Sequence, residues 1–118
     1  MKSKFYVFTL LALISTGLVA APRNLITAKV NGGDWSSPST WNLGSVPQNN
    51  DSIVIPAGYT VILNNSYTLN NVDVVIAGTL NFNQNKTLAL DAASMVSILS
   101  GGTLTASHPT PNELLTIG

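Results

Sequence analysis

The sequence predicts an all-β protein: a short, right-handed, single-stranded parallel β-helix of about two and a half to three coils with an N-terminal loop cap. Strand–glycine–strand units recur along residues 51–118, apolar residues alternate with polar ones, and no stretch after residue 20 has a helical period. Recurring units of this kind are typical of stacked solenoids, in which each unit buries its apolar face against a neighbour. A β-sandwich of hairpins is the alternative, because short strands at this spacing fit it as well.

Residues 1–20 are predicted to be a secretory signal peptide. Lys2 and Lys4 precede an uncharged apolar run that ends in small residues at Ala20 and Ala21. The run is shorter than the roughly 20 apolar residues of a membrane-spanning helix, so a retained anchor is the less favoured alternative. We therefore expect a secreted or cell-surface protein with no membrane contact after the signal is removed.

The chain after residue 20 carries little charge. Of the five basic residues, two are Lys2 and Lys4, so three remain against five acidic residues, and there is no cysteine. A nucleic-acid partner is not expected, because such a partner requires a basic patch. The missing cysteines remove disulfides and the usual zinc and iron–sulfur ligands. We expect no cofactor and no metal.

Residues 21–50 are interpreted as a lead-in strand, expected over residues 25–30, then a turn at 31–34 and a loop that contains Trp35 and Trp41. If they are buried, the two indoles cover the first coil, and each removes about 150–250 Å² from water. If they are exposed, they can stack on sugar rings. Both interpretations stay open at this point, with the cap favoured.

Residues 51–118 contain the predicted coils. Gly58, Gly78 and Gly102 are separated by 20 and then 24 residues, and with Gly101 they allow positive φ or a close backbone approach at a corner. Matching positions predict two stacks of side chains, one of Ile55, Ile76 and Ile98 and the other of Val61, Leu80 and Leu104. No polar cap or charged tail follows the last predicted strand, so we expect the coils to be truncated at the C-terminal end.

An ordered set of short motifs resembles the G-eight (eight-glycine) domain. The motifs are Trp35-x5-Trp41, Gly44-x-Val46-Pro47, Asp51, Val54 to Gly58, Ile76-x-Gly78-Thr-Leu80, Ile98-x2-Gly101-Gly102-Thr-Leu104 and Leu115 to Gly118. They cover nearly all of the chain after the signal, although Thr105 to His108 stands where the family carries a further glycine.

The resemblance implies an extracellular all-β module in the N-terminal part of exported parallel β-helix proteins, as in fibrocystin and hyaluronan-depolymerising surface proteins. It brings no catalytic residues to this chain. The glycines, Pro47 and Asp51 of the motifs are expected to shape turns or the cap.

Few residues suggest chemistry. Asp51 is expected to accept hydrogen bonds from backbone N–H groups at a turn. Asp73 and Asp91 lie nearly one repeat apart, and a glycosidase needs two carboxylates about 5–10 Å apart. Neither has a basic or aromatic residue beside it in the sequence, so a solvated surface is the preferred interpretation. His108, the only histidine, is interpreted as a loop residue.

The sequence therefore favours a non-catalytic extracellular module that starts and caps a parallel β-helix. The expected partner is the downstream β-helix of a longer chain or a second copy of the chain itself. One alternative is a carbohydrate-binding module that contacts polysaccharide through Trp35 and Trp41. A second alternative is part of a polysaccharide-degrading enzyme that depends on Asp73 or Asp91.

Overall fold

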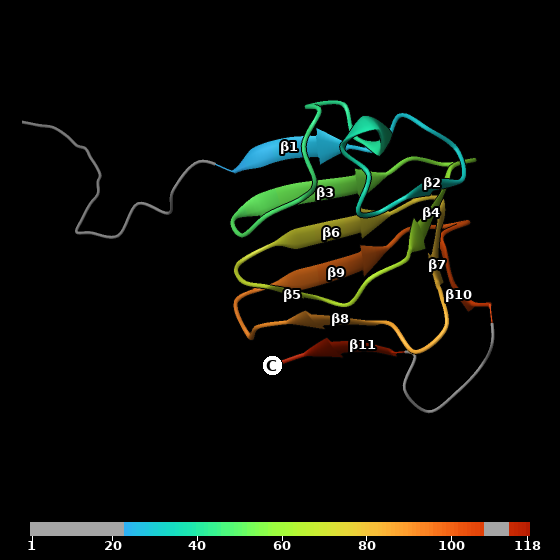
Figure 1. Ribbon diagram of the computed structural model, residues 1–118. Helices are drawn as coiled ribbons and strands as arrows, with labels where there is room; N and C mark the ends of the chain where they lie inside the picture. Colours follow the sequence, from blue (N-terminus) through green and yellow to red (C-terminus); the bar gives the residue numbers. More distant parts are fainter. Residues whose placement is uncertain (1–22, 108–113) are drawn as a thin grey trace, which may run out of the picture.

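The computed structural model of the chain describes residues 23–107 and 114–118 (Figure 1). The predicted signal peptide and His108 lie outside the described residues. The regular structure of the described part is β-strand, apart from one short 3-10 helix, and this confirms the all-β prediction. The elements are β1 (Asn24–Thr27), β2 (Gly33–Asp34), η1 (Pro38–Thr40), β3 (Asp51–Ile55), β4 (Thr60–Leu63), β5 (Tyr67–Leu69), β6 (Asp73–Ile76), β7 (Thr79–Phe82), β8 (Thr87–Leu90), β9 (Met95–Ile98), β10 (Thr103–Ala106) and β11 (Leu114–Ile117).

The strands form three parallel sheets with the orders β1-β3-β6-β9, β10-β7-β4-β2 and β11-β8-β5. Consecutive strands of the chain enter different sheets, and each strand from β3 to β8 pairs with the strand three places further along. Figure 1 shows β1, β3, β6 and β9 one below another. The parallel pairing excludes the alternative sandwich of hairpins, because a hairpin joins antiparallel strands.

The strands form groups of three that recur along the chain. The first repeat is β3 to β5, the second is β6 to β8, and the third is β9 to β11, while β1 and β2 precede the first. The register confirms both predicted stacks: Ile76 pairs with Ile55 and Ile98, and Leu80 pairs with Val61 and Leu104. One repeat therefore lies directly on the next.

The core lies between the three sheets, where alternate residues of each strand point inward. In the first two repeats the inward residues are buried, apart from the partly buried Tyr67, as the predicted alternation requires. The buried residues of these repeats are Ile53, Ile55, Val61, Leu63, Leu69, Val74, Ile76, Leu80, Phe82, Leu88 and Leu90. The third repeat differs, since Ile98 is 50% and Leu104 38% exposed. No described strand lies beyond β9 or β10, so no strand of the described part covers these inward positions.

The lead-in differs from the prediction in two places. Strand β1 ends at Thr27 rather than at residue 30, because Ala28 forms an isolated antiparallel bridge with Trp41 and the chain turns toward the loop. The expected turn at residues 31–34 contains β2, whose Gly33 and Asp34 pair with Val61 and Ile62 of β4. The lead-in therefore supplies strands to two sheets rather than one.

The corner glycines serve two different purposes. Gly58 and Gly101 have positive φ values of 83° and 87°, which a side chain disfavours. Gly78 has no positive φ; a Cβ atom there would collide with the carbonyl oxygens of Pro56 and Tyr59. The register of the following threonines makes Gly78 equivalent to Gly102, whose added Cβ would meet the carbonyl of Ile76. Gly58 and Gly78, although they are 20 residues apart, are therefore not equivalent positions of the repeat.

Candidate functional site

Trp35 and Trp41 are fully buried in the core cluster, with relative exposures of 0%. Their ring centroids lie 5.2 Å apart in an edge-to-face arrangement, and Trp35 also contacts the ring of Tyr67 at 6.0 Å. The indole N–H of Trp41 donates a hydrogen bond to the backbone oxygen of Trp35 at 2.9 Å. Neither ring has a face open to a sugar, so Trp35 and Trp41 do not support the carbohydrate-binding hypothesis.

The other motif residues of the lead-in hold the loop before β3. Gly44 has a positive φ of 71°, and Pro47 is buried. Asp51 is 7% exposed, and its Oδ2 accepts a hydrogen bond from the backbone N–H of Gln48 at 2.8 Å. This contact closes the turn from Gln48 to Asp51, which is the structural role expected for the aspartate.

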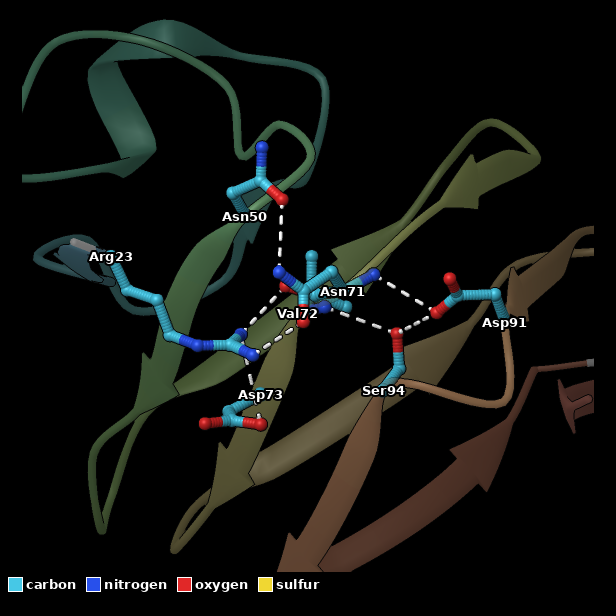
Figure 2. A network of polar contacts seen from close by, with 7 residues as sticks. All are labelled: Arg23, Asn50, Asn71, Val72, Asp73, Asp91 and Ser94. Carbon is cyan, nitrogen blue, oxygen red and sulfur yellow. Dashed lines mark hydrogen bonds and ion pairs between the residues drawn. The ribbon is translucent and has the colours of Figure 1, made fainter. Parts of the chain in front are cut away.

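Asp73 and Asp91 each have protein partners in a polar network between neighbouring corners (Figure 2). Asp73 Oδ1 lies 3.7 Å from Nη1 of Arg23. Asp91 Oδ1 accepts hydrogen bonds from the backbone N–H of Asn71 at 2.9 Å and from the Ser94 hydroxyl at 2.7 Å. The Asn71 N–H, followed by the Ser94 hydroxyl, lowers the pKa of Asp91, while desolvation opposes this shift.

These contacts give both carboxylates a structural explanation. The general acid of a glycosidase needs a raised pKa, so the lowered pKa of Asp91 does not suit that one role. Asp73 has no basic neighbour in the sequence, but in the fold Arg23, which directly precedes β1, reaches it from 50 positions earlier in the chain. No local motif in the sequence links Arg23 to Asp73; only the parallel pairing of β1 with β3 and of β3 with β6 does so.

The third repeat presents an apolar end, which we call the open end. It consists of the inward residues Val96, Ile98, Leu104, Leu115 and Ile117, which are partly or largely exposed. The described residues of this repeat, 95–107 and 114–118, include no charged side chain. Sheet edges that face solvent usually carry charges, prolines or bulges that block further strands. This end lacks the charges and the prolines in its described strands, and it therefore suits contact with other strands.

A shallow depression with a volume of about 520 Å³ lies where the loop before β3 passes β5. It is lined by Pro47, Gln48, Asn49, Asn50, Thr68 and Leu69. None of these side chains is ionisable. No sequence motif joins these residues, because the two halves of the set lie about 20 residues apart and meet only through the fold.

The described residues contain no group of three His, Asp or Glu side chains placed to hold a metal ion. In this same part of the chain, no helix is long and apolar enough to cross a membrane.

The stacked parallel strands and their glycine corners define a repeat protein built from three-strand units. The G8 domain family matches residues 40–113, and the chain belongs to this family. The resemblance to the eight-glycine domain is thereby confirmed. Comparison with curated proteins gave no match, and comparison with solved structures gave none either.

Proposed function

We propose that the chain is a non-catalytic extracellular module that starts a right-handed parallel β-helix, closes its first end and offers its other end to further coils. The observation that carries the proposal is the difference in burial between the two ends. Ile26, Trp35 and Trp41 are 0% exposed, whereas Ile98 and Ile117 are about half exposed, at 50% and 51%.

The first end is closed by the lead-in. Thr40 of η1 is 2% exposed, and its hydroxyl donates to the Asp34 backbone oxygen at 2.8 Å. Figure 1 shows the loop that carries η1 on the β1 side of the stack, with β11 at the opposite end. Terminal repeats of solenoids need such a cover, since an uncovered repeat exposes its apolar interior.

The second end matches the surface that a following coil would require. The register of the third repeat continues the two before it, so a further set of strands could pair with β9, β10 and β11 in the same way. Parallel strands joined through crossovers are nearly always right-handed, which supports this hand for the helix. The apolar run at residues 5–20 and the G8 family support an extracellular location.

The enzyme alternative is disfavoured by the contacts of its two acids. Arg23 pairs with Asp73, and the Asn71 N–H and the Ser94 hydroxyl donate hydrogen bonds to Asp91. The carbohydrate-binding alternative is not favoured by the tryptophans, which are buried.

The experiment compares the two edges of one sheet. Ile98 on β9 and Leu25 on β1 are exposed by 50% and 59% and lie at opposite edges of the sheet β1-β3-β6-β9. The chain is expressed with its own N-terminal segment, and its self-association is followed by sedimentation over a range of concentrations. We expect Ile98→Lys to reduce association by about tenfold or more, because it places a charge in the apolar end.

Leu25→Lys is the matched control and should leave association unchanged, because its side chain points away from the core on the closed side. Equal behaviour of the two variants and the wild type would contradict the proposal. A wild-type chain that stays monomeric at all concentrations and binds no hydrophobic dye would contradict it as well.

A further inference from the structure

The depression beside β5 is bordered by three consecutive polar residues, Gln48 to Asn50, and by the exposed hydroxyl of Thr68. Pro47 and Leu69 add two buried apolar side chains. Ligand sites combine apolar side chains with hydrogen-bonding groups that fix the orientation of the ligand, and this depression has both kinds of residue.

The orientation of the Asn50 amide is fixed by a relay that begins at Arg23 (Figure 2). A guanidinium can only donate, so the Asn71 atom 2.7 Å from Arg23 Nη2 must be its side-chain oxygen. The amide nitrogen of Asn71 then donates to the side-chain oxygen of Asn50 at 3.0 Å. As a result, the Asn50 Nδ2 is directed away from Asn71, and among the described residues it has no hydrogen-bond partner.

The orientation of the Asn49 amide is fixed by a separate contact. The backbone N–H of Asn70 donates to Asn49 Oδ1 at 2.8 Å, so this atom must be the oxygen. In the described part of the chain, Asn49 Nδ2 has no protein partner. Two neighbouring amides therefore have their oxygens tied to the protein and their N–H groups available, at a reduced entropic cost of ordering them on binding.

We propose that this depression binds a unit of a neutral saccharide, with Asn49 and Asn50 donating to its oxygens and Thr68 hydrogen-bonding to a hydroxyl. A sugar unit combines hydroxyl oxygens with apolar C–H groups, which matches amides beside Pro47 and Leu69. A neutral ligand is favoured because no lining side chain is charged. This site uses no residue of the open end and does not depend on the proposed β-helix role.

The test follows the side-chain amide signals of Asn49 and Asn50 by NMR while neutral hexasaccharides are added to the intact chain at millimolar concentrations. Cellohexaose, laminarihexaose and mannohexaose are the neutral probes, and a galacturonic acid hexamer is the acidic comparison. We expect at least one neutral probe to shift both amide signals. Asn50→Asp should weaken that binding by about tenfold, because it removes one donor and keeps the oxygen that Asn71 requires.

Asn83→Asp is the matched control. Asn83 is an exposed turn residue whose Oδ1 also accepts a backbone N–H, that of Gln84 at 2.9 Å, but it lies outside the depression. This variant should bind as the wild type does. Thr68→Val should weaken binding with little change in shape. Arg23→Met should weaken it as well, although Arg23 does not line the depression, because it frees Asn71 and with it Asn50.

No shift with any neutral probe would overturn the proposal. Shifts with the acidic hexamer alone would also overturn it, because the ligand would then be anionic. Equal weakening by Asn50→Asp and Asn83→Asp would show that charge rather than position governs the response, and this too would overturn it.

Discussion

The indole N–H of Trp41 donates to the backbone oxygen of Trp35 at 2.9 Å, and the two rings meet edge to face at the closed end. The indole N–H of Trp35 is buried and has no hydrogen-bond partner among the described residues. The two tryptophans are equally buried, but only one of them satisfies its polar atom. Their contributions to stability should therefore differ.

Trp41→Phe should lower the free energy of unfolding by about 1–3 kcal/mol more than Trp35→Phe does. Both substitutions remove a similar ring area, but the first also removes the hydrogen bond to Trp35, while the second removes an unpaired N–H. Chemical denaturation of the two variants measures the difference. Equal losses of stability would mean that the hydrogen bond contributes nothing.

A pair of cysteines tests the register of the second and third repeats. The hydroxyl oxygens of Thr79 and Thr103 lie 2.9 Å apart on neighbouring strands β7 and β10. The chain has no cysteine of its own, so Thr79→Cys with Thr103→Cys should give one defined disulfide on oxidation. A bond across this loop should stabilise the fold by about 3 kcal/mol. Intact mass and non-reducing digestion identify the product.

The control pair is Thr60→Cys with Thr103→Cys. These residues lie in the same column, but β7 stands between their strands, so no intramolecular disulfide should form. Efficient closure in the control would contradict the strand order β10-β7-β4.

Asp91 should make stability depend on pH. Its pKa is lowered in the folded chain from an ordinary value of 3.8, first by the Asn71 N–H and then by the Ser94 hydroxyl. The stabilisation is therefore complete above about pH 3.8 and is lost as the pH falls through the lower folded pKa. Asp91→Asn should be less stable than the wild type at pH 7, and the two should converge in acid. Thermal unfolding of both proteins from pH 7 to pH 2 checks this, and parallel curves would refute it.

Much of the fold could be predicted from residues 51–104. The alternation of Ile53 with Ile55, and of Leu80 with Phe82, marks the inward faces directly, because a strand turns successive side chains to opposite sides. The stacks of Ile55 with Ile76 and of Val61 with Leu80 followed from matching positions around the glycines. The local strand–glycine–strand pattern was therefore enough to predict the inward faces and the stacked positions.

Other features were not predictable in this way. Gly33 and Asp34 have the composition of a turn, but they form β2 because β4 offers them an edge. The burial of both tryptophans was the favoured prediction, but exposure stayed open because burial depends on how the whole lead-in packs. The depression joins Asn49 to Thr68, and the relay joins Arg23 to Asn71, across 48 positions. These contacts involve the lead-in, the loop before β3 and the turns, which carry no repeated pattern, so the local sequence does not show which residues meet there.

The composition of the open end determines which interactions can bind a partner there. The described residues of the open end carry no charged side chain, so they contribute no side-chain ion pair to an association at β9, β10 and β11. Backbone hydrogen bonds and apolar contact remain, and neither is screened by dissolved ions. Ionic strength in the ordinary range should therefore leave such an association nearly unchanged, while strongly excluded salts such as sulfate should tighten it.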